Sequence, residues 1–138
     1  DRQERRLLLA RDRFGEKPLY WGWLDHAGQR VLLFASELAA LRACPGAAAP
    51  AVNPEALAAF FRAGCLPAPL SIYAGLQQLP SGHWVELRSP HQQIDPQPWW
   101  NLQDQAAQAF AQQPLLAEKS EADVLDQLER TLQQVIAP

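Results

Sequence analysis

The sequence contains no methionine, and only two cysteines, Cys44 and Cys65, occur among its 138 residues. Neither cysteine belongs to a CxxC pair, and no histidine stands at the spacing of a zinc site. We therefore expect no metal site and a reducing, cytoplasmic environment. The longest apolar runs, such as residues 31–35, are far shorter than the roughly 20 residues that span a bilayer. The charged start leads into no signal-peptide core, so we expect no membrane partner.

A dominant charge of one sign is also missing, because 12 Lys and Arg residues stand against 15 Asp and Glu residues, for a net charge of -3. A basic face is what attracts nucleic acid, so we expect no nucleic-acid partner. No phosphate-binding glycine loop occurs. The hydrophobic content of 48% is sufficient for a globular core. The lack of methionine and a charged start that runs directly into apolar residues predict that Asp1 is not a natural start and that the chain is cut from a longer protein.

Short apolar runs separated by turn residues predict a β-rich first half. We expect strands at residues 6–10, 19–24 and 30–35, with the last two joined as a hairpin by turn residues at 25–28. These three strands should be neighbours in one sheet. The proline-rich residues 66–81 should be mostly irregular, and residues 82–88 alternate as a short closing strand.

Helix signals follow the third strand. Ser36 is expected to cap a helix over residues 37–43. Asn53 and Pro54 begin a second helix, which Gly64 is placed to end.

The last third of the sequence changes character. Residues 89–119 are rich in Gln, Pro and Ala and read as a linker or insertion. Ser120 then caps a strongly amphipathic helix over residues 121–136, whose apolar stripe needs a partner surface.

The first candidate site is the charged turn between the first two strands. Asp12 can hold a neighbouring guanidinium in a fork, and Gly15 permits a tight backbone path. A solvated hairpin tip explains the same residues, and chemistry alone favours that interpretation. Ser36 and Glu37, at a strand-to-helix junction, could bind a ligand, but capping and the helix dipole explain both.

The remaining reactive and aromatic residues favour structural roles. Cys44 and Cys65 have no basic partner nearby in sequence, so we interpret both as small buried residues. The three histidines, His26, His83 and His91, are scattered, and we expect them at the surface. Trp21 and Trp23 alternate onto one face of a strand, which indicates a core more often than a shelf for a ligand.

Ordered sequence blocks carry a family resemblance. LLLARDRFGEKPLY at residues 7–20 and FASELAAL at residues 34–41 resemble the second half of class II glutaminase domains. NPEAL at residues 53–57, PAPLSIY at residues 67–73 and LPSGHW at residues 79–84 are similar to the asparagine synthetase branch of that family.

The resemblance implies an α+β fold, part of the N-terminal-nucleophile (αββα) glutaminase sandwich followed by a linker and one amphipathic helix. Residues 1–90 are expected to be the C-terminal half of the glutaminase domain, residues 91–119 a linker or insertion, and residues 120–138 the first helix of the ATP-using synthetase domain.

The resemblance also implies a reaction for the larger protein. In this family an N-terminal cysteine hydrolyses glutamine, and the ammonia amidates aspartate in an ATP-dependent step that implies Mg²⁺. That cysteine and the nucleotide loop match no segment of this sequence, so we expect no cofactor and no activity for this chain alone. Glutamine, aspartate and ATP are the partners implied for the larger protein.

The residues of this sequence that match functional positions of the family are expected to have supporting roles only. None is expected to be catalytic or to bind substrate. The turn that faces the synthetase domain near the ammonia channel corresponds to Arg11, Asp12, Gly15, Glu16, Lys17 and Pro18. The junction beneath the glutamine pocket corresponds to Ser36 and Glu37.

Two other functions fit the same sequence. One is a non-catalytic binding or assembly module built on the glutaminase scaffold. The other is an amidotransferase that acts on another carboxylate, for example in surface polysaccharide synthesis. In either case a partial sandwich exposes sheet edges, so we expect the chain to self-associate.

Overall fold

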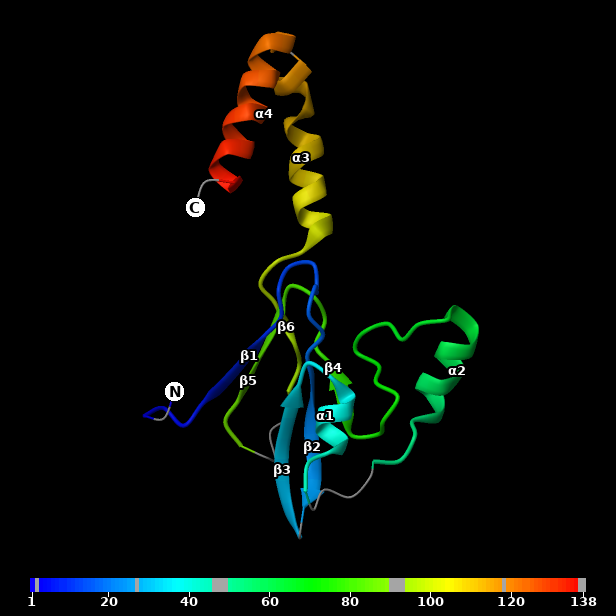
Figure 1. Ribbon diagram of the computed structural model, residues 1–138. Coiled ribbons are helices and arrows are strands. Elements are labelled where there is room, and N and C mark those ends of the chain that lie inside the picture. The colour runs from blue at the N-terminus through cyan, green and yellow to red at the C-terminus, as the bar shows by residue number, and fades with distance from the viewer. Residues whose placement is uncertain (2, 27, 46–49, 90–93, 118, 137–138) are drawn as a thin grey trace. The chain divides into compact units, whose positions relative to one another are not determined.

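A computed structural model describes residues 1, 3–26, 28–45, 50–89, 94–117 and 119–136 (Figure 1). The chain divides into two compact units, Asp1–Trp100 and Asn101–Pro138. In the described residues, the first unit contains two three-stranded antiparallel sheets and two helices, and the second contains two helices. The mixed α+β class expected from the sequence is confirmed. None of the described helices has the length and apolar character needed to cross a membrane.

The first sheet has the order β1-β5-β6, with β1 at Leu7–Ala10, β5 at His83–Leu87 and β6 at Gln97–Pro98. Its register places Leu7 opposite Leu87 and Leu9 opposite Val85. Directly opposed residues of an antiparallel pair share a face, so these four side chains lie together. The predicted closing strand is confirmed as β5, which pairs along β1.

The second sheet has the order β3-β2-β4, with β2 at Tyr20–His26, β3 at Gln29–Ala35 and β4 at Leu76–Gln78. The predicted β2–β3 hairpin is confirmed. The prediction that β1 joins these two strands in one sheet is wrong, because β1 pairs with β5 and the free edge of β2 is taken by β4. Both pairings link distant segments, which local patterns do not reveal, and β4 lies within the stretch predicted to be irregular.

A single core cluster joins the inner faces of the two sheets. Its buried members are Leu9, Trp21, Leu79, Val85 and Leu87. Trp23 and Leu32, which face each other across the β2–β3 hairpin, pack against this cluster. The core role predicted for Trp21 and Trp23 is confirmed.

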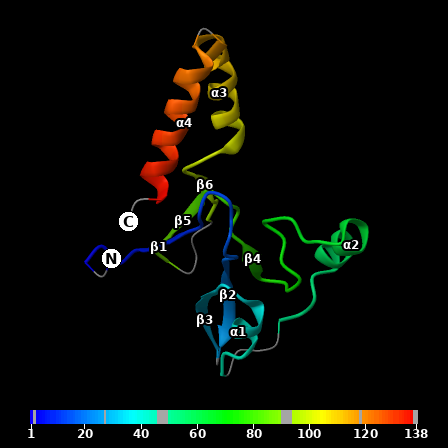
Figure 2. The ribbon, with the colours of Figure 1, turned by 45° about the horizontal axis from the view of Figure 1, so that its top comes forward.

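Helix α1 (Leu38–Arg42) follows β3 and packs beside it (Figure 2). The predicted cap is wrong, because the N-cap residue is Glu37 and no side chain accepts a hydrogen bond there. The helix begins one residue later than the Ser36 cap requires, so the Ser36 hydroxyl does not serve the free amides of the first turn.

Helix α2 (Pro54–Ala63) has the ends predicted for it. Oδ1 of Asn53 accepts hydrogen bonds from the amides of Glu55 at 3.0 Å and Ala56 at 3.4 Å. Gly64 follows in the left-handed conformation with φ 71°, and its amide donates to the Phe60 carbonyl at 2.7 Å. Ala56 is fully buried, whereas Phe61 is 80% exposed, so much of the apolar surface of α2 faces solvent.

The second unit contains α3 (Leu102–Ala117) and α4 (Glu121–Ile136), drawn in yellow and in orange to red in Figures 1 and 2. Helix α3 was not predicted from the linker-like composition, because its Ala and Gln residues favour helix without making an apolar stripe. The predicted Ser120 cap is confirmed, since its Oγ accepts the Asp123 amide at 3.2 Å. No residue of α4 is buried among those described.

Several cysteine and histidine predictions fail. Cys44 is half-buried, but Cys65 is exposed, because it follows the end of α2 at Gly64. His26 and His83 are half-buried in strands rather than at the surface. His91 lies outside the described residues.

Candidate functional site

Arg11 organises the loop between β1 and β2. Its guanidinium donates from Nε to the Lys17 carbonyl at 3.0 Å and from Nη2 to the Gly15 carbonyl at 2.9 Å. A third hydrogen bond runs from Nη1 to the Leu79 carbonyl at 2.7 Å. Because a guanidinium presents donors in a rigid planar fork, these bonds fix the loop against itself and against the segment that precedes β5.

Asp12 binds the inside of the same loop. Its carboxylate accepts hydrogen bonds from the amides of Phe14 and Glu16, both at 3.0 Å, and of Lys17 at 3.4 Å. The hydrogen bond from the Glu16 amide is the largest cause that holds the pKa of Asp12 below its ordinary value of 3.8. The predicted pairing of Asp12 with a guanidinium is wrong, because the carboxylate binds backbone amides instead.

Gly15 is the one position where the loop excludes a side chain on two grounds. Its φ of 69° lies in the left-handed region, which a residue with Cβ rarely adopts. A Cβ placed there would also lie 2.8 Å from Nη2 of Arg11. Glycine at this position therefore permits both the positive φ of the turn and the close approach of the Arg11 guanidinium.

Gly82 joins the loop to two distant segments. Its amide donates to the Asp12 carbonyl at 2.9 Å, and its own carbonyl accepts the amides of Trp99 at 2.8 Å and Trp100 at 3.1 Å. A Cβ at Gly82 would lie 2.4 Å from the Trp100 carbonyl oxygen. The close approach of these backbones therefore requires glycine.

Trp99 and Trp100 cover the loop from outside. Nε1 of Trp99 donates to the Arg11 carbonyl at 3.2 Å, and the Arg13 guanidinium lies 5.6 Å from the Trp99 ring. Phe14 meets Trp100 edge to face at 5.3 Å. The loop is thus a fixed element with contacts on several sides, not a freely solvated tip.

The other predicted site residues lie around this framework. Glu16 and Lys17 have exposed side chains, and Pro18 is half-buried. Ser36 and Glu37 are also exposed. Because Tyr20 pairs with Ala35, the loop and the Ser36–Glu37 junction meet at the same end of the β2–β3 hairpin. No hydrogen bond or ion pair joins the two groups in the described part of the chain.

The sequence did not predict the residues outside the loop that hold it in place by hydrogen bonds. Leu79, Gly82 and Trp99 contact Arg11 or Asp12, although 88 residues separate Arg11 from Trp99. Of these residues, Leu79 and Gly82 lie in the family-like block LPSGHW at residues 79–84, and no local rule links any of them to the loop.

The arrangement leaves two charged side chains at the surface of a fixed loop. Arg11 and Asp12 direct their polar atoms at the backbone, which leaves Glu16 and Lys17 displayed on a rigid loop. Within the described ranges, no cluster of three His, Cys, Asp or Glu residues could hold a metal ion.

The comparisons with known proteins show which family this sequence belongs to. Residues 1–100 match the glutamine amidotransferase domain, and the match ends where the first compact unit ends. The chain therefore belongs to the family of glutamine amidotransferase domains. It is similar to asparagine synthetase (glutamine-hydrolyzing) 2 of Bacillus subtilis (strain 168), with 31% identity over 108 residues. That match covers 75% of this chain but 14% of the relative, so the chain spans about a seventh of the relative's length. No solved structure matches the chain.

Proposed function

We propose that this chain is part of a glutamine-hydrolysing asparagine synthetase. It contains the C-terminal half of an N-terminal-nucleophile glutaminase domain and, from residue 120, the first helix of the ATP-using domain. In the whole protein, glutamine hydrolysis supplies ammonia for the ATP-dependent amidation of aspartate to asparagine. The observation that carries the proposal is the match of residues 1–100 to the glutamine amidotransferase domain.

The fixed loop has a positioning role in this proposal. Arg11 and Asp12 hold the backbone of residues 11–18 by hydrogen bonds at both ends. Glu16 and Lys17 are then displayed towards the ATP-using domain, at the floor of the glutaminase domain near the ammonia passage. Ser36 and Glu37 support the glutamine pocket from the neighbouring junction.

We also propose that the chain alone hydrolyses no glutamine. Its cysteines are a half-buried Cys44 and an exposed Cys65, both free, and no side-chain hydrogen bond of either is found among the described residues. A thiol without a neighbouring base is a weak nucleophile. ATP and Mg²⁺ belong to the proposed activity of the whole protein, and the described residues offer no cluster to hold the metal.

A chimera tests the proposal. The segment of the Bacillus subtilis relative that matches this chain is replaced by residues 1–100, and glutamate and asparagine are measured with glutamine and with free ammonia. We expect both products from glutamine, and none from the isolated chain. The unmodified relative is the positive control.

The chimera also separates the alternatives. A folded chimera that makes asparagine from ammonia but does not hydrolyse glutamine would contradict the enzymatic proposal and favour a non-catalytic module. The acceptor is tested in the gene's own full-length product: glutamine hydrolysis without asparagine formation would favour another carboxylate. A cysteine directly after the initiator methionine in that gene supports the enzyme.

A further inference from the structure

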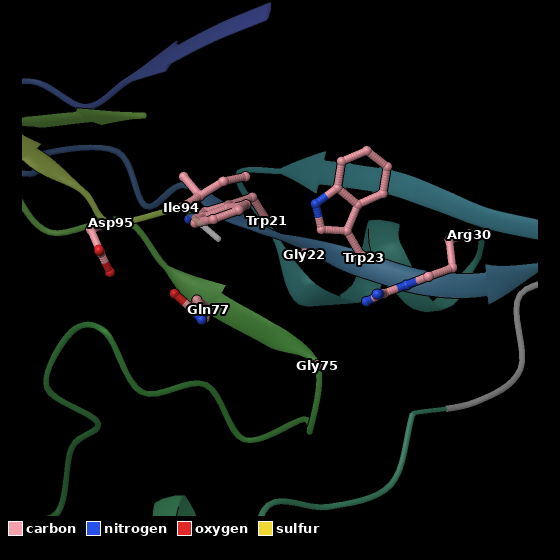
Figure 3. Close-up of a pocket in the computed structure, with 8 residues that line it drawn as sticks. All are labelled: Trp21, Gly22, Trp23, Arg30, Gly75, Gln77, Ile94 and Asp95. Carbon is pink, nitrogen blue, oxygen red and sulfur yellow. The ribbon is translucent and has the colours of Figure 1, made fainter. Parts of the chain in front are cut away.

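Trp99 differs from the tryptophans of the core. Trp21 and Trp23 lie on β2, where they border the cavity of about 400 Å³ shown in Figure 3 and pack in the core cluster or against it. Trp99 is 46% exposed, yet its indole N–H donates to the Arg11 carbonyl at 3.2 Å. Because so exposed a ring buries little apolar surface, packing in the core does not explain this side chain. Its specific contact is the hydrogen bond to the loop of residues 11–18.

The hydrogen bonds of Trp99 close a circuit among three segments of the chain. The Gly82 amide donates to the Asp12 carbonyl at 2.9 Å, and the Trp99 amide donates to the Gly82 carbonyl at 2.8 Å. The Trp99 indole completes the circuit at Arg11, the neighbour of Asp12. Hydrogen bonds in such a network strengthen one another. A shift of any one segment therefore disturbs the bonds of the other two.

The rings of Trp99 and Trp100 extend these contacts along the loop. The Arg13 guanidinium lies 5.6 Å from the centroid of the Trp99 ring, a distance at which a cation is attracted to an aromatic face. Phe14 meets Trp100 edge to face, with the ring centroids 5.3 Å apart. The two tryptophans thus contact the loop at its start and towards its tip.

The same two tryptophans lie where the first compact unit ends. This unit ends at Trp100, and α3 begins two residues later at Leu102. Strand β6, which directly precedes Trp99, pairs with β5 and holds this segment against the first sheet. The chain therefore enters the second unit directly from the residues that hold the loop.

We propose that Trp99 is a positioning residue that couples the loop of residues 11–18 to the connection between the two units. The coupling rests on the proposed function, in which this loop displays Glu16 and Lys17 towards the ATP-using domain near the ammonia passage. A change in that domain that moves the connection displaces Trp99, and the loop follows. Without the indole hydrogen bond the loop loosens, and part of the ammonia released from glutamine escapes to water before it reaches aspartate.

Hydrogen exchange of the whole chain tests the positioning of the loop. Trp99→Phe keeps an aromatic ring and removes the indole donor. The exchange rates are measured at the amides of Phe14 and Glu16, which donate to the Asp12 carboxylate inside the loop. We expect both amides to exchange about fivefold faster in the variant, the effect of one lost hydrogen bond.

Trp84→Phe is the matched control. Trp84 is half-buried on β5, and no hydrogen bond of its indole is found in the part of the chain that the structure describes. This variant should leave the loop amides near their native rates. The amides of the β2–β3 hairpin report the stability of the fold and should change alike in both variants. Native rates at the loop in Trp99→Phe, or equal acceleration of loop and hairpin amides, would overturn the positioning role.

The full-length product of the gene tests the coupling. The readout is the ratio of asparagine formed to glutamate released when glutamine is the nitrogen source. We expect Trp99→Phe to lower this ratio at least about twofold, because a loosened loop no longer shields the reaction from water. Asparagine formation from free ammonia should stay unchanged, and Trp84→Phe should keep the native ratio.

The proposed function and the coupling fail in different ways. A native full-length product that forms no asparagine from glutamine contradicts the proposed function and with it the coupling, whereas hydrogen exchange still decides whether Trp99 positions the loop. A native product that forms asparagine from glutamine, with the same ratio in Trp99→Phe, overturns the coupling alone.

Discussion

Arg11 and Asp12 are adjacent residues of opposite charge, yet they do not pair with each other. Arg11 donates to three carbonyls, and the Asp12 carboxylate accepts three backbone amides. The loop is therefore fixed from both sides by side-chain to backbone hydrogen bonds.

Arg11→Lys should destabilise the first unit by about 1–2 kcal/mol. A lysine ammonium lacks the planar fork and cannot reach three carbonyls in the same geometry. Urea unfolding followed by tryptophan fluorescence measures this, because all five tryptophans lie within residues 1–100. Arg62→Lys, at an exposed position on α2, is the control and should leave the free energy of unfolding unchanged.

Gly15→Ala should cost more stability than Gly28→Ala. Both glycines have positive φ, of 69° and 80°, so both substitutions impose the same kind of backbone strain, about 1 kcal/mol. At Gly15 the new Cβ meets the Arg11 guanidinium, whereas none of the described residues lies within 4 Å of a Cβ at Gly28. We expect about 2–3 kcal/mol for Gly15→Ala by the same urea assay. Equal effects would contradict the packing of Arg11 against Gly15.

The Asp12 carboxylate should stabilise the loop in a pH-dependent way. Its pKa is lowered in the folded chain from 3.8, so its contribution is fully present above 3.8 and is lost as the pH falls through the lower folded value. We expect the difference in unfolding free energy between the native chain and Asp12→Asn to be constant near neutral pH and to shrink in acid below 3.8. A difference that grew in acid would contradict the lowered pKa.

Among the elements, the starts of α2, α3 and α4 are capped by local side-chain hydrogen bonds. Asn53→Ala should destabilise the first unit by about 1 kcal/mol, because two amides of α2 lose their acceptor. Hydrogen exchange of the α2 amides measures the loss.

Asn101→Ala is the matched variant for α3. Oδ1 of Asn101 accepts the Gln103 amide at 2.8 Å, in the second unit. We expect faster exchange in α3 and no change in α2. Faster exchange in both helices from either substitution would show that the caps do not act locally.

At the scale of the whole molecule, large apolar side chains remain exposed. On α4 the described stripe includes Val124, Leu128 and Leu132, which are 42%, 54% and 49% exposed. Exposed apolar stripes and free sheet edges promote association between copies.

Association between copies of the chain is therefore a prediction. The double substitution Leu128→Glu and Leu132→Glu should lower the average mass measured by light scattering at high concentration. The double substitution Gln127→Glu and Gln134→Glu, also on α4, adds the same two negative charges and should leave the mass unchanged. A native chain that stays monomeric at every concentration would contradict the prediction.

The sequence predicted the features that depend on neighbouring residues. The β2–β3 hairpin follows from two apolar runs around a turn, the start of α2 from Asn53 and Pro54, and the start of α4 from Ser120. The family was also predicted, because its sequence blocks occur in order within residues 1–100, where the glutamine amidotransferase match lies.

The sequence alone thus determined the family, the hairpin, the ends of α2 and the amphipathic α4, because each depends on residues close together in the chain. Only the tertiary structure decided that β1 pairs with β5, that β4 completes the second sheet, and that Leu79, Gly82 and Trp99 fasten the Arg11 loop. These contacts join segments far apart in sequence, and their free energy depends on backbone geometry that no local pattern encodes. The same holds for the burial of the Trp21 indole, because Trp21 is covered only when the strands of the first unit have packed.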